Sequence, residues 1–176
     1  MRRKYPGALP CVFDDASHLS TIDRAVRRTR AIASFLSGAM RMDYPVKILL
    51  AWGEAISGNA QLRDWLVKNG YPELGIFCFA LRNKPDARDW LMKNGHPQLM
   101  AVINGIEGDE GALDWLERNG MQALKQVALT GDGDAEALKW LVANGHRELA
   151  MLGHKMHVVK RGLDDEYTDP HKFPQA

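Results

Sequence analysis

Two histidines, His154 and His157, stand at the spacing that best suits metal binding in this sequence. Positions i and i+3 of a helix share one face, so both imidazoles could reach the same metal ion. No carboxylate or third ligand accompanies them at helical spacing, and a pair of this kind is typical of surface histidines. We expect no metal and no other cofactor.

A column of carboxylates is the second arrangement that could do chemistry. Asp64, Asp89 and Asp114 recur every 25 residues, a spacing that suggests a cation-binding groove, but Lys139 takes the fourth place. Drift among repeats explains the column more simply. The Gly-Asp-Gly-Asp run at 131–134 lacks the remaining ligands of an EF-hand, and no glycine-rich loop has phosphate-cradle spacing. We therefore expect the protein not to be an enzyme.

Tryptophan recurs with the same period, inside the motif "DWLVKNG" and its copies "DWLMKNG", "DWLERNG" and "KWLVANG". The four residues are Trp65, Trp90, Trp115 and Trp140. One interpretation is a structural wedge that is buried in every layer, and the alternative is an exposed aromatic ladder that faces a ligand. Each tryptophan lies on an apolar i, i+3, i+4 stripe, which favours the buried wedge.

The motif lies at the end of the second half of each unit in a strict 25-residue repeat. A fixed period of this kind is typical of a solenoid. Each unit reads as helix, tight turn, helix and Asn-Gly turn, with the glycine placed to end the second helix. The sequence predicts an all-α fold: a right-handed αα-superhelix of about four two-helix repeats behind an N-terminal capping helix. The repeat domain covers residues 46–159, with units at 46–70, 71–95, 96–120 and 121–145 and a terminal first helix from His146.

Columns that differ between units are the natural place for a binding surface. Two such columns lie beside the buried stripe of the first helices, and their apolar and polar side chains suggest a groove for a partner helix or peptide. The alternative is packing between adjacent first helices. The candidate partner-binding residues are Gly75, Phe79, Met100, Asn104, Lys125, Leu129 and His154.

The first 45 residues precede the repeats and are basic. Residues 1–13 read as a flexible arm, and residues 14–45 as a capping helix and linker. An apolar seam along this helix suits either a cover for the solenoid end or a coiled-coil-like dimer contact. The charged face can contact nucleic acid or an acidic partner, or it can simply be solvated. Its arginines are Arg24, Arg27, Arg28 and Arg30.

Composition sets the remaining limits. Residues 1–47 hold nine Lys/Arg against four Asp/Glu, whereas residues 48–176 hold fourteen against eighteen, so a long nucleic-acid track is not favoured. Cys11 and Cys78 read as reduced thiols, and no apolar run is long enough to cross a membrane. We expect a cytoplasmic protein without membrane contact. Residues 160–176 read as a flexible tail.

The stretch "GDAEALKWLVANGHRELAML", residues 133–152, resembles the two helices of an ankyrin repeat, whose second helix commonly carries Leu-Leu before a glycine. The β-hairpin finger of that family is missing, which accounts for a period of 25 rather than about 33. The Thr-Pro-Leu-His turn is also absent. Over residues 46–159 the resemblance implies an ankyrin-like or generic αα-repeat fold. By analogy it implies a non-catalytic module that binds a protein or peptide, with nucleic-acid binding through the basic N-terminal region as the alternative.

Overall fold

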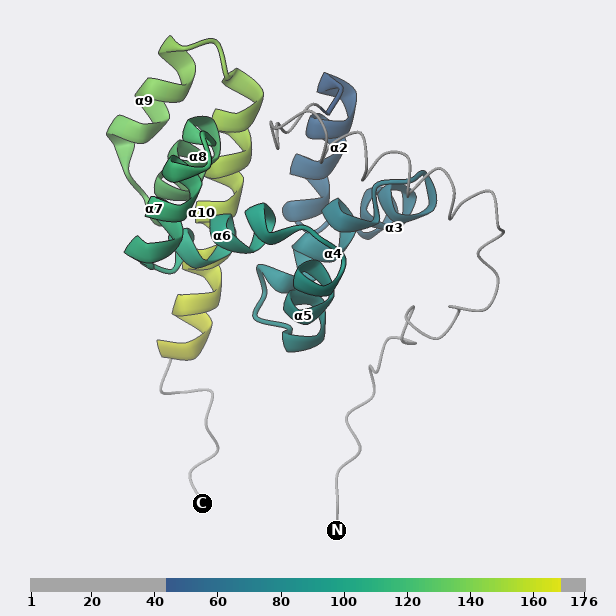
Figure 1. Ribbon diagram of the computed structural model, residues 1–176. Helices are drawn as coiled ribbons and strands as arrows, with labels where there is room; N and C mark the ends of the chain where they lie inside the picture. The colour runs from purple at the N-terminus through teal and green to yellow at the C-terminus, as the bar shows by residue number, and fades with distance from the viewer. Residues whose placement is uncertain (1–43, 169–176) are drawn as a thin grey trace, which may run out of the picture. The chain divides into compact units, whose positions relative to one another are not determined.

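The structure, a computed structural model, describes residues 44–168, with side chains as far as Leu163, and this part of the chain is all-α. Within it lie nine helices and no strand, and neighbouring helices pack in sequence order (Figure 1). This confirms the predicted all-α, solenoid-like class. The helices are α2 (Val46–Ile56), α3 (Ala60–Lys68), α4 (Pro72–Ala80), α5 (Pro85–Lys93), α6 (Pro97–Ile106), α7 (Glu110–Arg118), α8 (Gln122–Asp132), α9 (Ala135–Ala143) and α10 (Arg147–Thr168).

The predicted arm (1–13), the arginines at positions 24–30 and all of the predicted capping segment before Tyr44 lie outside the described residues.

The Asn-Gly pairs end the second helix of every unit in the same way. The asparagine Nδ2 donates to the carbonyl of the tryptophan four residues earlier, at 2.7 or 2.8 Å in all four units. The next glycine takes a positive φ between 72° and 89°, which leads the chain out of the helix. The same tryptophan carbonyl also accepts the backbone N–H of that asparagine at 3.0 or 3.1 Å, so the asparagine binds the end of the helix through two groups. The pairs are Asn69-Gly70, Asn94-Gly95, Asn119-Gly120 and Asn144-Gly145.

Three of the four second helices begin with a side-chain cap. Asn59, Asp109 and Asp134 each accept a backbone N–H from the first turn of the helix that follows. The fourth helix, α5, follows Lys84 and begins with Pro85, whose missing N–H would have had no helical partner. The sequence therefore fixes where each of these short helices begins.

The first helices of the units form an inner layer. α2, α4, α6, α8 and α10 supply most of the buried side chains, including Trp52, Phe77 and Ile103. The second helices α3, α5, α7 and α9 form an outer layer, in which each helix buries only one or two residues. The sequence agrees with this division, because the apolar stripe is wide on each first helix and narrow on each second helix.

The prediction that the four repeated tryptophans are buried wedges is wrong for Trp65 and correct only in part for the other three, which pack against the core without being fully buried. Trp65 is 44% exposed, and the other three are half-buried. The leucine that follows each tryptophan is the buried wedge, because Leu66, Leu91, Leu116 and Leu141 are all 0% exposed. One residue turns a helix by about 100°, so a helix that buries a narrow stripe centred on leucine leaves the adjacent tryptophan at its edge.

The last helix packs against the first. α10 contacts α8 and α9, its neighbours in sequence, and also α2 at the other end of the repeats. A Cβ built at Gly53 in α2 would lie 2.9 Å from Cε of Met151 and 3.4 Å from Cδ2 of Leu152, so the two helices approach closely there. Periodicity relates only neighbouring units, and it therefore does not predict this contact.

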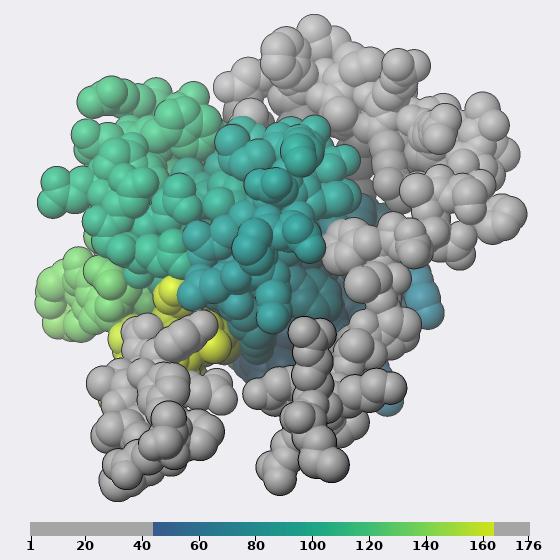
Figure 2. Space-filling model, turned by 90° about the horizontal axis from the view of Figure 1, so that it is seen from below, coloured from purple at the N-terminus to yellow at the C-terminus, as the bar shows by residue number. Residues whose placement is uncertain are grey.

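The structure also differs from the predicted tail at 160–176, because α10 continues to Thr168. Figure 2 shows the end of this helix at the surface, in yellow. Lys160 donates from Nζ to Oε1 of Glu107 at 2.9 Å, and Val159 packs against the core. These contacts hold the helix beyond the point at which the repeat pattern ends.

Candidate functional site

The variable columns of the first helices mostly face the preceding outer helix. A Cβ built at Gly75 would lie 2.5 Å from Cγ2 of Val67, and the Arg63 guanidinium lies 4.5 Å from the centre of the Phe79 ring. Lys125 donates to Glu117 at 2.6 Å. Of the other candidate residues, Met100 is buried, Asn104 and Leu129 are half-buried, and His154 is exposed.

The column that contains Gly75, Met100 and Lys125 varies because each of these residues lies at a junction between an outer helix and the next first helix. Residues eight apart meet across two of these junctions, Val67 with Gly75 and Glu117 with Lys125, while Met92 and Met100 line one groove at the third. A branched side chain lies against glycine, a methionine near a methionine, and an acid beside a base. Each junction is therefore packed in its own way, and compensating pairs at this spacing are the sequence signal that reveals it.

Met100 and Asn104 do come together, in an apolar groove between α5, α6 and α7. The groove has a volume of about 250 Å³. Met92 on α5, which is 56% exposed, and Trp115 on α7 also line it. The remaining lining residues are Pro97, Ala101, Asp109 and Ala112.

A second groove lies at the equivalent place in the first unit, between α2 and α3. Its volume is about 400 Å³, and it is lined by Pro45, Lys47, Ile48, Ala51, Leu62, Trp65 and Tyr71. Four columns are shared by the two grooves, two repeats apart: Lys47 with Pro97, Ala51 with Ala101, Leu62 with Ala112, and Trp65 with Trp115. We call the first-unit cavity groove 1 and the third-unit cavity groove 2.

The second and fourth units place larger or stacked side chains at the same columns. Ile76 and Gln126 stand where the grooves have alanine. His96 stacks on Trp90 with ring centroids 6.0 Å apart and an angle of 8°, and His146 stacks on Trp140 in a similar way. Burial lowers the pKa of His96, against the opposing charge of Glu73, so the stacked imidazole favours its neutral form. The alanine column thus alternates between small residues, in the two units that hold these grooves, and larger ones in the other two.

Opposite charges border the two grooves. Lys47 lines groove 1 and Asp109 lines groove 2. Both residues are exposed, and Oδ1 of Asp109 also accepts the backbone N–H of Ala112 at 3.2 Å, which fixes its carboxylate at the start of α7.

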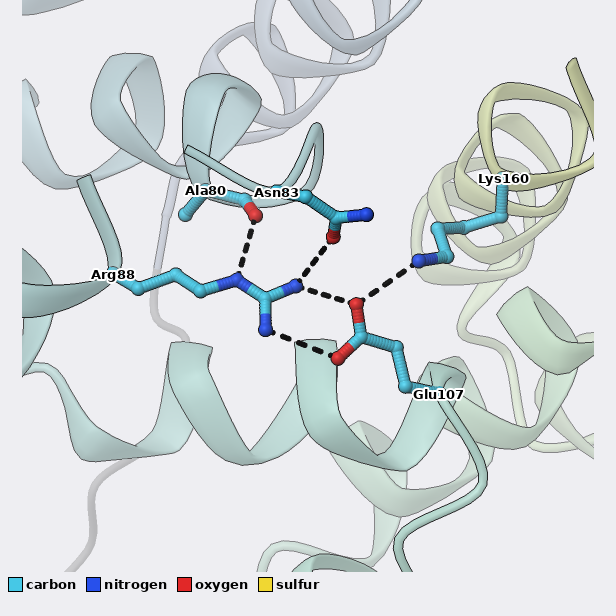
Figure 3. A network of polar contacts seen from close by, with 5 residues as sticks. All are labelled: Ala80, Asn83, Arg88, Glu107 and Lys160. Carbon is cyan, nitrogen blue, oxygen red and sulfur yellow. Dashed lines mark hydrogen bonds and ion pairs between the residues drawn. The ribbon is translucent and has the colours of Figure 1, made fainter. Parts of the chain in front are cut away.

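A polar network ties the third unit to its surroundings (Figure 3). The Arg88 guanidinium binds both carboxylate oxygens of Glu107, the carbonyl of Ala80 and Oδ1 of Asn83. Lys160 reaches the same carboxylate from α10. Burial raises the pKa of Glu107, but hydrogen bonds and positive charge from Arg88 and Lys160 outweigh it and hold the pKa below its usual value. The network is a structural junction, and its groups are engaged with one another.

The two histidines considered for metal binding have different surroundings. His154 is exposed, while Nδ1 of His157 lies 3.2 Å from the carbonyl of Gly131. Among the side chains that the structure describes, residues 44–163, no three His, Cys, Asp or Glu are grouped so as to hold a metal ion. Burial raises the pKa of the free Cys78 thiol to about 12, against the charges of Arg82 and Arg63, so this sulfur stays protonated.

Searches of protein-family models, curated proteins and solved structures find no match to this chain. The resemblance to ankyrin repeats thus stays a prediction, based on the spacing of the helices. Among the described helices, none is long and apolar enough to span a membrane.

Proposed function

We propose that the protein is a non-catalytic interaction module, an ankyrin-like αα-repeat that binds a protein or peptide through its tryptophan-walled grooves. The observation that carries the proposal is the recurrence of one apolar groove at equivalent positions of two units. A chance surface depression has no reason to return with the same alanine and tryptophan columns.

The chemistry of groove 2 suits an apolar side chain of a partner. Tryptophan supplies a large rigid contact surface and is common among the residues that dominate binding energy at interfaces. Met92 and Met100 add flexible thioether side chains that can adapt to a ligand's shape. Asn104 and Asp109 give the groove two polar groups that can orient what enters it.

A reducing cytoplasmic location is part of the proposal, and the buried free thiol of Cys78 supports it. Binding of nucleic acid by Arg24, Arg27, Arg28 and Arg30 stays a prediction, because those residues lie outside the described part of the chain.

The test fills the groove with a side chain that the fold already accepts at that column. The variant Ala101→Ile copies Ile76 of the second unit, and Ala51→Ile does the same in groove 1. We expect peptides selected from a displayed random library on the full chain to lose most of their affinity for the double variant. The matched control is Ala143→Ile, at an exposed helical alanine away from both grooves.

Circular dichroism should show the same helicity in all three proteins. Selected peptides that bind the double variant as tightly as they bind the unmodified chain would contradict the proposal. So would a library that yields no binder at all.

A further inference from the structure

Groove 2 differs from groove 1 in the charge at its border, and this difference points to the class of partner. We propose that groove 2 takes a basic amphipathic helix, which inserts an apolar side chain and places a lysine or arginine beside Asp109. The inference rests on the proposed function, because it specifies the ligand of the same groove.

The third unit carries the acidic charge of the repeats. Residues 96–120 contain five Asp/Glu and one Arg, whereas residues 46–70, which hold groove 1, contain two Asp/Glu and three Lys/Arg. A cationic ligand would therefore be attracted to the third unit and not to the first. Attraction of this kind guides a partner to its site and discriminates between partners more than it adds affinity.

Most of these carboxylates already have a basic partner. Glu107 is bound by Arg88 and Lys160, Asp114 pairs with Arg118, and Glu117 pairs with Lys125.

Two carboxylates at the start of α7 remain available. Asp109 and Glu110 form no ion pair with any other described side chain, and Asp109 itself lines the groove. The acidic border therefore lies beside the apolar floor, where a bound helix would meet both.

A helix presents this combination naturally. Residues i and i+3 or i+4 lie on one face, so an apolar anchor and a cation one turn away can contact the floor and Asp109 together. Met92, Met100 and Trp115 would receive the anchor. In groove 1 the position equivalent to Asp109 is the neutral Asn59, and the charged residue that lines the groove is Lys47, which disfavours a cationic ligand there.

The chain itself offers a variant that separates charge from structure. Asp109 caps α7 by accepting the N–H of Ala112, and Asn59 caps α3 in the same way by accepting that of Leu62. Asp109→Asn should therefore keep the cap and remove only the charge. Lys47→Gln is the matched change at the border of groove 1.

The experiment titrates the full chain with two synthetic helical peptides of identical leucine pattern, one with lysine on its polar face and the other with glutamate. Calorimetry should show that the Leu/Lys peptide binds more tightly than the Leu/Glu peptide. Asp109→Asn should weaken Leu/Lys binding about two- to fivefold and reduce its salt dependence, as expected for one exposed ion pair. Lys47→Gln should not weaken it.

The outcomes distinguish this inference from the proposed function. If Ala101→Ile abolishes Leu/Lys binding but Asp109→Asn leaves it unchanged, the groove binds peptides and the charge selection is wrong. Tighter binding of the Leu/Glu peptide, or no binding of the Leu/Lys peptide, would also overturn the inference. If Leu/Lys binding is indifferent to Ala101→Ile, groove 2 is not the site and neither proposal holds for it.

Discussion

Nζ of Lys155 in α10 lies 3.0 Å from Oε1 of Glu54 in α2, so an ion pair joins two residues that are 101 positions apart. Lys155 also donates to Oγ of Ser57 at the end of α2. Both contacts lie near Gly53, where a built Cβ would be 3.2 Å from Cδ of the same lysine. The repeats are thus held by stacking between neighbours and by this contact between the two ends.

Replacing Gly153 in α10 should test how tightly the last helix packs. A Cβ there would lie 2.8 Å from Cβ of Thr130 and 3.1 Å from the carbonyl of Val127, neither of which can easily move aside. We expect Gly153→Ala to lower the free energy of unfolding by about 1–3 kcal/mol, because overpacking outweighs the better helix propensity of alanine. Urea denaturation followed by circular dichroism measures the change.

Gly162 provides the control on the same helix, since a Cβ there meets no atom within 4 Å. Gly162→Ala should leave stability unchanged or raise it by up to about 1 kcal/mol. A Gly153→Ala protein that gains as much stability as Gly162→Ala would show that α10 is packed more loosely than described.

The adjacent residues Trp65 and Leu66 should contribute unequally to stability. Leu66 is fully buried and Trp65 is 44% exposed, so Leu66→Ala removes core contacts whereas Trp65→Ala mainly alters the surface. We expect Leu66→Ala to cost about 2–5 kcal/mol of unfolding free energy and Trp65→Ala clearly less. Denaturation of the two variants under the same conditions measures both losses of unfolding free energy. A larger loss for Trp65→Ala would show that the tryptophan is the structural wedge.

The period of 25 residues was enough to predict the helices, their order and the Asn-Gly ends, because these depend on local propensity and on contacts between neighbouring units. The exposure of Trp65 depends on whether Trp65 or Leu66 lies at the centre of the buried stripe. The two residues are adjacent, and the apolar spacing does not distinguish between them. The α2–α10 contact depends on the curvature accumulated over all units, which no single repeat encodes.

The candidate partner-binding residues have two kinds of surroundings in the structure. Met100 and Asn104 line groove 2, as a partner-binding surface requires, but Gly75 and Lys125 are engaged at junctions between helices. Columns vary both where partners bind and where neighbouring helices must compensate for each other. Variation alone does not separate the two cases, whereas the charge match of Glu117 with Lys125 does.

Acid should weaken the network around Glu107. The pKa of the Glu107 carboxyl is lower in the folded protein than in the unfolded chain, where that of glutamate is about 4.3. The unfolded chain therefore takes up the proton first as the pH falls. The stabilisation is fully present above the unfolded pKa and is lost as the pH falls through the folded one.

Glu107→Gln should accordingly be less stable than the unmodified protein at neutral pH, by about 1 kcal/mol for a partly exposed ion pair. The difference should shrink as the pH falls below 4.3 or so, and urea denaturation across this range measures it. A difference that stays constant with pH would mean that the Glu107 charge does not stabilise the fold. Asp114→Asn is the control, because its pair with Arg118 is well exposed and should matter little.

The methyl signals of the methionines test peptide binding in groove 2 most directly. Met92 and Met100 line the groove, whereas Met156 is 0% exposed in the core and reports any general rearrangement. On addition of the Leu/Lys peptide to the full chain, the methyl NMR signals of Met92 and Met100 should shift and that of Met156 should stay in place. The same titration of Ala101→Ile should produce neither shift. Calorimetric binding that leaves Met92 and Met100 unmoved, or that shifts Met156 equally, would contradict the account.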